Sequence, residues 1–481
     1  MPHELLTASR GFVDGKWIDA DHGESIAVTD PATGATLAVI PKMGAAEANR
    51  AIDAAATALS DPLSIERRER ILFAIGEALS SHREALAEQI TRENGKPLAE
   101  ARAEVDYAEG FFRHAGQHVK VTRSVELDER PGDHAWTIHH RPAGVAALIT
   151  PWNFPLAMLA KKVSAAIAAD CPFVVKPAES TPLSAMALVK ICDEAGLPRP
   201  RASLLAGDAD AIGKVFCTHP EVRVVSFTGS TRVGKILASQ SAEHFKRLAL
   251  ELGGNAPFVV FADADLDRAV GHLIPNKFRC AGQTCVCTNR VYVEASVADA
   301  FAEKLATEVR KLKVGNGLEE GVQLGPLINR GGFDKVLAHV NDAVGKGAVR
   351  VLGEDPVDPP GDHGCFFPPM ILRGVDESMA CAREETFGPI LPILEFESEE
   401  EVVRRANGTE YGLAAYVFTG DPDRGERVLR RLRFGHIGWN TGRGPTPEAP
   451  FGGMKSSGYG REGGIEGILE FCESQTVPRE G

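Results

Sequence analysis

The feature that most constrains the fold is a regular alternation of short apolar runs with amphipathic stretches, which begins at residue 143. Apolar runs of this length, bounded by glycine and proline, predict strands, and the stretches between them have the spacing of amphipathic helices. The successive segments are 143–150, 156–170, 172–178, 181–196, 202–207, 208–216, 222–230, 231–240 and 247–254. This alternation predicts a parallel, doubly wound sheet that helices cover on both faces.

Three further regions complete the predicted architecture. A second α/β run begins near residue 256 and ends near residue 453, which indicates a second domain. Residues 44–118 carry apolar side chains at helical spacing among charges and predict a helical flank. Residues 124–142 form two β-like runs around a Pro-Gly-Asp turn. A hairpin apart from the alternation needs a partner for its edge, and a symmetric oligomer could supply one.

The composition argues against several classes of protein. The 481 residues include 53 basic and 66 acidic side chains, and the basic ones are scattered rather than gathered into the stripe that a nucleic-acid surface needs. No segment approaches the 18 or so apolar residues of a membrane span, and the first residues lack the apolar core of an export signal. Nine cysteines, an odd number, fit reduced thiols better than a disulfide framework. We expect a cytoplasmic protein that handles a small molecule and binds neither nucleic acid nor a membrane.

Unusual residues follow three predicted strands of the first sheet, where ligands of open parallel sheets bind. They are Trp152 and Asn153 in TPWNFP, Lys176 and Glu179 in VVKPAE, and Gly229, Ser230 and Gly234 in FTGSTRVG. Taken alone, Lys176 and Glu179 could be an exposed salt bridge, and the glycine stretch could be a plain strand-to-helix turn. Together these residues predict a dinucleotide site, with the lysine and the acid near a ribose and a helix N-terminus near the pyrophosphate.

Cys285 and Cys287 stand one residue apart in GQTCVCTNR, and several roles are open to them. A metal site would need two more soft or imidazole ligands, and none follows at ligand spacing, so we expect no metal. A nucleophilic cysteine needs a group that lowers its pKa or takes its proton, and a base that later activates water. Glu251, in LELGGN at the end of the last strand of the first sheet, could be that base, because burial would raise the pKa of its carboxyl.

Five ordered motifs, TPWNFP, FTGST, LELGGN, GQTC and EETFGP, resemble those of the aldehyde dehydrogenase superfamily over nearly the whole chain. The resemblance implies that Cys285 attacks an aldehyde, that the Asn153 amide and the Cys285 backbone N–H hold the oxyanion, and that hydride passes to a nicotinamide. Glu251 would then activate water to hydrolyse the thioester. The cofactor residues carried over are Trp152, Asn153, Lys176, Glu179, Gly229, Ser230, Gly234, Leu252, Glu385 and Phe387. Glu251 argues against a CoA-acylating relative, and the scarcity of histidines near Cys285 argues against a cysteine hydrolase.

The same resemblance implies an α/β fold of two doubly wound Rossmann-type domains with a β-hairpin oligomerisation arm. The NAD-binding domain would comprise residues 1–121 and 142–252, the arm residues 122–141 and 468–481, and the catalytic domain residues 253–467. We expect a homodimer or a homotetramer.

The stretches KFRCAGQTCVCTNR and ENGKPLAEARAEVDYA are most similar to succinate-semialdehyde dehydrogenases. That subfamily holds the substrate's distal carboxylate with two arginines. Arg279 stands at the first position, but Lys161 replaces the second, which keeps the charge and loses the planar two-donor fork. Arg443, in a loop that departs from the subfamily pattern, is either a replacement anchor or a surface residue. The expected substrate is succinate semialdehyde or a similar carboxylated semialdehyde; glutarate or 2-oxoglutarate semialdehyde, or an uncharged aldehyde, are the alternatives.

Glu179 and Cys287 bear on the cofactor and on regulation. A carboxylate beside the adenosine ribose accepts hydrogen bonds from free hydroxyls and repels a 2′-phosphate, so NAD is expected to be preferred, with NADP as the alternative.

Cys287 either packs in the core or forms a reversible disulfide with Cys285. Such a bond would be strained and easily reduced, because residues two apart must distort the backbone to bridge.

Overall fold

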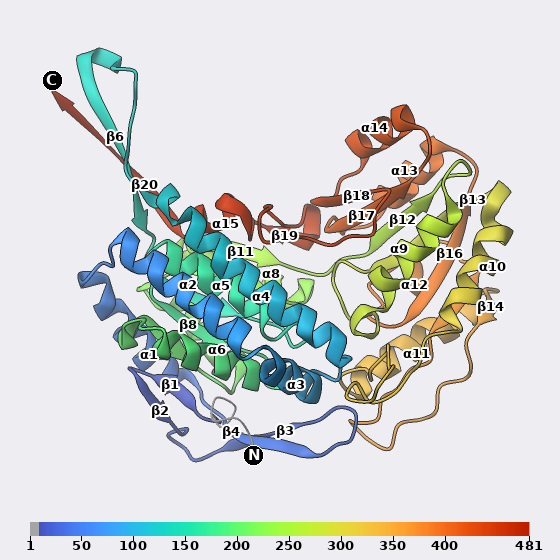
Figure 1. Ribbon diagram of the computed structural model, residues 1–481, viewed down its shortest axis with the longest axis horizontal. Helices are drawn as coiled ribbons and strands as arrows, with labels where there is room; N and C mark the ends of the chain where they lie inside the picture. The colour runs from blue at the N-terminus through green and yellow to red at the C-terminus, as the bar shows by residue number, and fades with distance from the viewer. Residues whose placement is uncertain (1–8, 481) are drawn as a thin grey trace.

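The computed structural model describes residues 9–480 and shows two α/β lobes, with a β-stranded arm projecting from one of them (Figure 1). The predicted first domain and arm also include residues 1–8 and 481, which lie outside the described residues. Among the described residues, no helix is long and apolar enough to cross a membrane.

The first lobe is built on an eight-stranded sheet with the order β19-β11-β10-β7-β8-β9-β1-β2. Its strands are β1 (Gly11–Val13), β2 (Lys16–Ile18), β7 (Val145–Ile149), β8 (Phe173–Lys176), β9 (Ala202–Leu204), β10 (Val222–Thr228), β11 (Arg247–Glu251) and β19 (Gly458–Tyr459). The central strands from β11 to β9 pair in parallel, which confirms the predicted sheet. Their apolar runs are continuous because helices bury both faces.

Two helix layers cover this sheet. The first layer contains α1 (Ala45–Thr57), α7 (Ala209–Thr218) and α8 (Thr231–Ser241). The second contains α2 (Ile65–Ser81), α3 (Arg83–Asn94), α4 (Leu98–His118), α5 (Ala157–Ala168), α6 (Leu183–Glu194) and the short α15 (Gly464–Leu469). The helical flank predicted for residues 44–118 is therefore α1 to α4, and α4 and α5 lie against each other between the sheet and solvent (Figure 1).

The antiparallel edges of the first sheet are not anticipated by the sequence analysis. At one edge β1 pairs with β9 and with β2, so the start of the described chain extends the sheet. At the other edge β19 pairs with β11, and Gly458 lies opposite Glu251. The chain thus returns to the first sheet within the range expected for the catalytic domain. This return brings residues after 450 beside the end of β11.

The second lobe contains a seven-stranded sheet with the order β14-β15-β16-β13-β12-β17-β18. Its strands are β12 (Ala256–Val260), β13 (Thr288–Glu294), β14 (Val349–Leu352), β15 (Met370–Arg373), β16 (Ile390–Phe396), β17 (Ala414–Phe418) and β18 (His436–Trp439). On one face lie α9 (Leu266–Phe278) and α10 (Ala298–Val309). On the other lie α11 (Arg330–Gly345), α12 (Ala380–Arg383), α13 (Glu399–Asn407) and α14 (Pro422–Arg431). The predicted second α/β unit is thus present.

The arm is a three-stranded sheet that stands clear of both lobes (Figure 1). The predicted hairpin supplies β5 (Val125–Glu126) and β6 (His134–Pro142), and β20 (Cys472–Glu480) pairs antiparallel with β6 along its whole length. Val125 and Leu127 are exposed on the arm. A separate two-stranded sheet, β3 (Ser25–Thr29) and β4 (Thr36–Pro41), lies at the base of the first lobe.

Candidate active site

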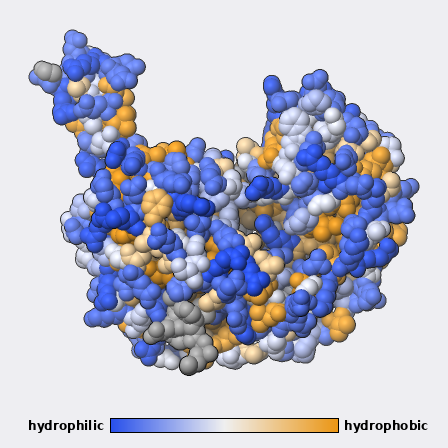
Figure 2. All heavy atoms as spheres, in the orientation of Figure 1, coloured by the Kyte–Doolittle hydropathy of each residue, from blue (hydrophilic) through white to orange (hydrophobic). Residues whose placement is uncertain are grey.

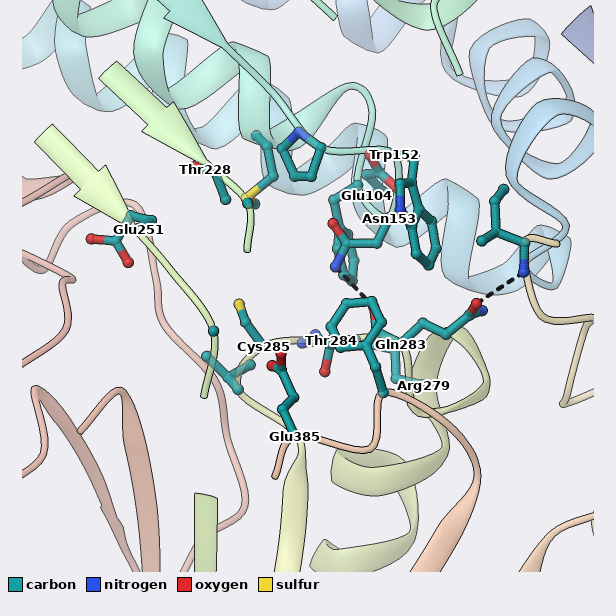
Figure 3. A pocket seen from close by; sticks show the side chains of 18 of the residues that line it. Glu104, Trp152, Asn153, Thr228, Glu251, Arg279, Gln283, Thr284, Cys285 and Glu385 are labelled. Carbon is teal, nitrogen blue, oxygen red and sulfur yellow. Dashed lines mark hydrogen bonds between the residues drawn. The ribbon is translucent and has the colours of Figure 1, made fainter. Parts of the chain in front are cut away.

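A cavity of about 660 Å³ is lined by residues of both lobes and collects most of the predicted site residues. The space-filling view shows a recess between the lobes (Figure 2), and the close-up shows the side chains around the cavity (Figure 3). The predicted residues that line it are Trp152, Asn153, Lys161, Gly229, Ser230, Glu251, Leu252, Arg279, Cys285, Glu385 and Phe387. Lys176, Glu179, Gly234 and Arg443 are not part of its wall.

Cys285 stands on the loop between the short helix η7 (Arg279–Gly282) and β13, with its thiol half-buried in the cavity. Burial raises the pKa of Cys285 to about 12, the negative charge of Glu385 adds to this effect, and the ammonium of Lys161 opposes it. The thiol is therefore protonated at neutral pH in this form of the protein, and attack on a carbonyl requires that its proton be removed.

The turn before the nucleophile has an unusual backbone. Cys280, Ala281 and Gly282 are all left-handed, with φ of 52°, 53° and 76°. A Cβ at Gly282 would lie 2.3 Å from the carbonyl oxygen of Gly388, so only glycine fits there. For a residue with a side chain this conformation costs roughly 1–2 kcal/mol. The Cys280 N–H donates to the Glu100 carboxylate at 2.7 Å, which helps to hold the turn.

Asn153 lies on the loop after β7 and is buried beside the nucleophile loop. Its Nδ2 donates to the backbone carbonyl of Gln283 at 2.8 Å (Figure 3). The Gln283 side chain in turn donates to the carbonyl of Cys280 at 3.0 Å and accepts from the N–H of Ile328 at 3.0 Å. An amide NH₂ has two donors, so Asn153 keeps a second N–H for a ligand in the cavity.

Glu251 is the last residue of β11, and only 2% of its surface is exposed. Neither carboxylate oxygen has a hydrogen-bond partner within the described chain. Burial raises the pKa of Glu251 to about 8, against the opposing positive charge of Lys161. A carboxyl that exchanges its proton in mildly alkaline solution can act as a general base, and in the close-up Cys285 lies between Glu251 and Asn153 (Figure 3).

Lys161 does line the cavity, but its ammonium is already paired. Both Lys161 and its neighbour Lys162 form ion pairs with the carboxylate of Glu462, and all three side chains are buried. Burial works to raise the pKa of Glu462, but the two ammonium charges outweigh it and lower the pKa to about 2. Lys161 therefore differs from the free carboxylate anchor that its position in the sequence suggests, because its ammonium is held in an ion pair with Glu462.

Arg279, unlike Lys161, has no ion-pair partner in the described part of the chain. Its guanidinium lines the cavity and lies 5.2 Å from the centre of the Phe154 ring. Its Nε is buried without a hydrogen-bond partner in the described part of the chain. Arg443 is exposed and lies outside the cavity wall, to which Pro445 and Thr446 of the same loop contribute. Of the three predicted anchors, only Arg279 presents an unpaired cation to the cavity.

The predicted cofactor residues outside the cavity wall, Lys176, Glu179 and Gly234, lie at the end of β8 or in the segments that follow β8 and β10, and Ser230 of the cavity wall lies in the second of these segments. Lys176 ends β8 and forms an ion pair with Glu179. Ser230 caps α8 by accepting a hydrogen bond from the Val233 N–H at 3.3 Å. A Cβ at Gly234 would lie 2.4 Å from a methyl carbon of Leu252, so α8 approaches β11 closely at this glycine.

The wall of the cavity nearest these residues suits a nicotinamide dinucleotide. Glu385 accepts from the Gly254 N–H at 3.0 Å, and burial raises the pKa of its carboxyl to about 7. A carboxylate has further acceptor positions that ribose hydroxyls can use. Trp152 and Phe387 meet edge to face, with ring centres 5.6 Å apart. A carboxylate, aromatic walls and a capped helix N-terminus are the groups that such a cofactor requires.

The Cys287 thiol is buried and makes two polar contacts within the described residues. Its Sγ lies 3.2 Å from the carbonyl oxygen of Gly282 and 4.0 Å from the Nζ of the buried Lys277. All nine cysteines are free thiols. Among the described residues, no group of three or more histidine, cysteine, aspartate or glutamate side chains is arranged to hold a metal ion.

Comparison with known proteins identifies the family. The model of the family described as "Aldehyde dehydrogenase family" matches residues 17–477. The chain belongs to the aldehyde dehydrogenase family. It is 45% identical over 470 residues to a glutarate-semialdehyde dehydrogenase of Pseudomonas putida, and equally to the succinate-semialdehyde dehydrogenase (NADP+) GabD of Escherichia coli, with 97% of each chain covered. A crystal structure of succinate-semialdehyde dehydrogenase from Burkholderia pseudomallei is 46% identical, covers 100% of both chains and has a TM-score of 0.97.

This aldehyde dehydrogenase thus has the family, the fold and the enzyme class that its motifs predict: it is an oxidoreductase that uses NAD or NADP to oxidise a small aldehyde. Several residues around its cavity are missed by the sequence analysis. They are Lys96, Glu104, Tyr107 and Glu462. Lys96, Glu104 and Tyr107 belong to the stretch quoted for its subfamily likeness, which is the signal that could have marked them.

Proposed function

We propose that this aldehyde dehydrogenase oxidises a semialdehyde that carries a carboxylate at its far end, with succinate semialdehyde as the first candidate. The observation that supports this most is the guanidinium of Arg279, which faces the cavity and has no ion-pair partner in the described chain. A buried donor without an acceptor is costly, and a substrate carboxylate would satisfy it. The similar proteins named for succinate and glutarate semialdehydes agree with this class of substrate. Glutarate or 2-oxoglutarate semialdehyde, or an uncharged aldehyde, remain the alternatives.

Cys285 and Asn153 carry the first step in this proposal. The Cys285 sulfur, after loss of its proton to solvent water, bonds to the aldehyde carbon, and the carbonyl electron pair moves onto the oxygen. The Asn153 amide and the Cys285 backbone N–H donate to this oxyanion, and one such donor contributes about 3–4 kcal/mol to the transition state. A nicotinamide cofactor held at the proposed site would supply the hydride acceptor, and loss of hydride from the same carbon would leave a thioester on Cys285.

Glu251 carries the second step. Its ionised carboxylate takes a proton from water, and the oxygen of that water bonds to the thioester carbon. The carbon–sulfur bond then breaks, and sulfur leaves as a thiolate, which is a fair leaving group. For each hydride removed, the acyl carbon gains one oxygen from water and two protons are released. The cycle returns Cys285 to its starting state.

The proposed cofactor site consists of the ten residues named for it, with Glu385 at the nicotinamide ribose and Lys176 and Glu179 at the adenosine ribose. A carboxylate at Glu179 repels a 2′-phosphate, so NAD is the proposed cofactor in preference to NADP. The ion pair with Lys176 holds this carboxylate at the end of β8. A higher kcat/KM with NADP than with NAD would contradict the preference.

The arm supports a proposal of assembly into a homodimer or a homotetramer. It projects from the body and exposes Val125 and Leu127, with hydrophobic surface visible on it in Figure 2. Edge strands and apolar side chains of this kind are usually covered by another chain.

We propose the NAD-binding, arm and catalytic ranges given above as functional units. A cytoplasmic location is proposed because the nine thiols are free.

The substrate proposal is tested by replacing Arg279 with alanine and measuring KM for succinate semialdehyde and for butanal, an uncharged aldehyde of the same chain length. Loss of hydrogen bonds to a charged group costs about 1.5–3 kcal/mol, so KM for the semialdehyde should rise roughly 10- to 150-fold. KM for butanal should change less than about threefold. Arg443→Ala is the matched control, because it removes an arginine outside the cavity and should alter neither value. Equal effects of Arg279→Ala on both aldehydes would overturn the proposal.

A further inference from the structure

A fully buried ion pair lies next to the cavity and takes no part in the proposed steps. Lys96 Nζ is 2.5 Å from Glu104 Oε2, and neither side chain has any exposed surface. Removing two charges from water is expensive, and apolar side chains of similar volume often stabilise a fold as well or better. The ion pair is therefore not explained by a gain in stability. Its role is inferred from the groups that it contacts.

Both members of the pair hold the loop that carries Asn153. Lys96 Nζ donates to the backbone carbonyl of Asn153 at 2.7 Å and lies 3.8 Å from the centre of the Phe154 ring. Glu104 uses its other oxygen to accept from the N–H groups of Leu156 and Ala157, at 2.9 and 3.2 Å, where α5 begins. In the close-up Glu104 is seen beside Asn153 (Figure 3).

A third side chain completes the set. Asn94 is fully buried, and its Nδ2 donates to the backbone carbonyl of Trp152 at 3.0 Å. We call Asn94, Lys96 and Glu104 the loop clamp. The clamp binds the backbone immediately before Asn153, at Asn153 itself and at the start of the following helix. These contacts come from the end of α3, the α3–α4 connection and α4, which precede the loop by about fifty residues in the chain.

The clamp and the Asn153 side chain act on the same short piece of backbone. With its carbonyl held by Lys96 and its Nδ2 bound to the Gln283 carbonyl at 2.8 Å, Asn153 is fixed relative to the loop that bears Cys285. A donor to an oxyanion works only if it is oriented before the charge develops, and a displacement of about 1 Å can cost about 100-fold in rate.

We propose that Lys96 is a positioning residue for aldehyde oxidation: paired with Glu104, it fixes the backbone of Asn153 so that the Asn153 amide meets the oxyanion on the substrate. Lys96 touches neither substrate nor cofactor and acts through Asn153. This inference rests on the oxyanion role proposed above for Asn153.

The test replaces both members of the pair, because Lys96→Met alone would leave a buried carboxylate without a partner. In Lys96→Met/Glu104→Gln the glutamine carbonyl can still accept from the start of α5, while the donor to the Asn153 carbonyl is lost. The rate of the first burst of reduced cofactor and the steady kcat should fall about 10- to 100-fold, with KM for the aldehyde changed less than about threefold. The rate of Cys285 alkylation by iodoacetamide should stay close to that of the unaltered enzyme, because the nucleophile keeps its surroundings.

A double-mutant cycle with Asn153→Ala separates positioning from general damage. If Lys96 acts through Asn153, the Lys96/Glu104 change should cost less than about threefold more once Asn153 is alanine. Loss by the same factor in both backgrounds would overturn the inference, as would a folded Lys96/Glu104 variant with kcat within about threefold of normal. Lys246→Met is the matched control: this lysine is also buried and donates to two carbonyls, at His219 and Val222, but lies outside the cavity wall. It should lower the unfolding temperature while leaving kcat unchanged.

If the Lys96/Glu104 variant does not fold, Asn94→Ala decides, because it loosens the same backbone without leaving a buried charge. A fall in kcat that disappears in the Asn153→Ala background supports the clamp, and an unchanged kcat overturns it. The kcat of Asn153→Ala alone distinguishes failure of the proposed oxyanion role from failure of the inference about Lys96. If that variant keeps its kcat, the proposed oxyanion role itself fails. If it loses activity while the clamp variants do not, only the present inference fails.

Discussion

With Glu251 as the proposed base, its pKa predicts how the rate of thioester hydrolysis depends on pH. Burial raises this pKa to about 8, so the active, ionised base is lost as the pH falls through that value. About a tenth of the Glu251 carboxyls are ionised near pH 7 and about a hundredth near pH 6, because each unit below the pKa lowers the ionised fraction roughly tenfold. The hydrolysis rate should therefore rise about tenfold per pH unit from pH 6 and level off above about pH 8.

Rapid mixing of enzyme, aldehyde and oxidised cofactor separates hydrolysis from the step before it. The first burst of reduced cofactor reports the formation of the thioester, and the later steady rate reports its hydrolysis. Because the pKa of Cys285 is about 12, the burst rate should keep rising beyond pH 9, where the steady rate has levelled off. Glu251→Gln should keep the burst and lower the steady rate by roughly 10²- to 10⁴-fold, the usual contribution of a general base. A steady rate that is flat between about pH 6.5 and 9, or unchanged in Glu251→Gln, would refute this reasoning.

Two further predictions concern residues at the margins of the site. Glu179→Ser removes the carboxylate that repels a 2′-phosphate, so the ratio of kcat/KM with NADP to that with NAD should rise at least about tenfold; an unchanged ratio would place cofactor choice elsewhere. Cys287→Ser should keep kcat within about threefold, because the polar contacts of the Cys287 thiol are with Gly282 and Lys277, and neither residue has a role in the proposed steps. If mild peroxide still inactivates this variant and dithiothreitol restores it, Cys287 is not the disulfide partner of Cys285.

Most of the fold could be predicted because its signals are local. Alternating apolar runs and amphipathic helices mark the parallel centre of the first sheet, and both of its faces are covered as expected. The antiparallel edges escaped prediction, because β1 and β19 are only three and two residues long and their pairing depends on chain far away in sequence. Short edge strands carry too few residues to show a period.

Some features of the candidate site could likewise be predicted from the sequence, and others could not. The positions of Cys285, Asn153 and Glu251 follow from motifs at strand ends and loops, and the structure brings all three to one cavity. The state of Lys161 could not be predicted, because its partner Glu462 lies about 300 residues further along the chain.

The direction of the Arg443 side chain and the burial of the loop clamp could not be predicted from the sequence either. Loop geometry directs Arg443 to the surface, and no periodic pattern in the sequence announces that direction. Lys96 and Glu104 stand on a predicted helical region as two charges among many, and only the folded structure shows that they are buried together behind Asn153. Burial of a charge is decided by tertiary packing, which the local sequence does not encode.

We propose that this aldehyde dehydrogenase selects aldehydes that carry a distal carboxylate. The most direct measurement is kcat/KM, by formation of reduced cofactor, for a series of ω-carboxylated and uncharged aldehydes of graded length, with NAD and with NADP. Arg279 facing the cavity predicts that succinate semialdehyde, or a neighbour in the carboxylated series, exceeds the uncharged aldehyde of equal length by at least about tenfold. Equal or higher values for the uncharged aldehydes would contradict the account.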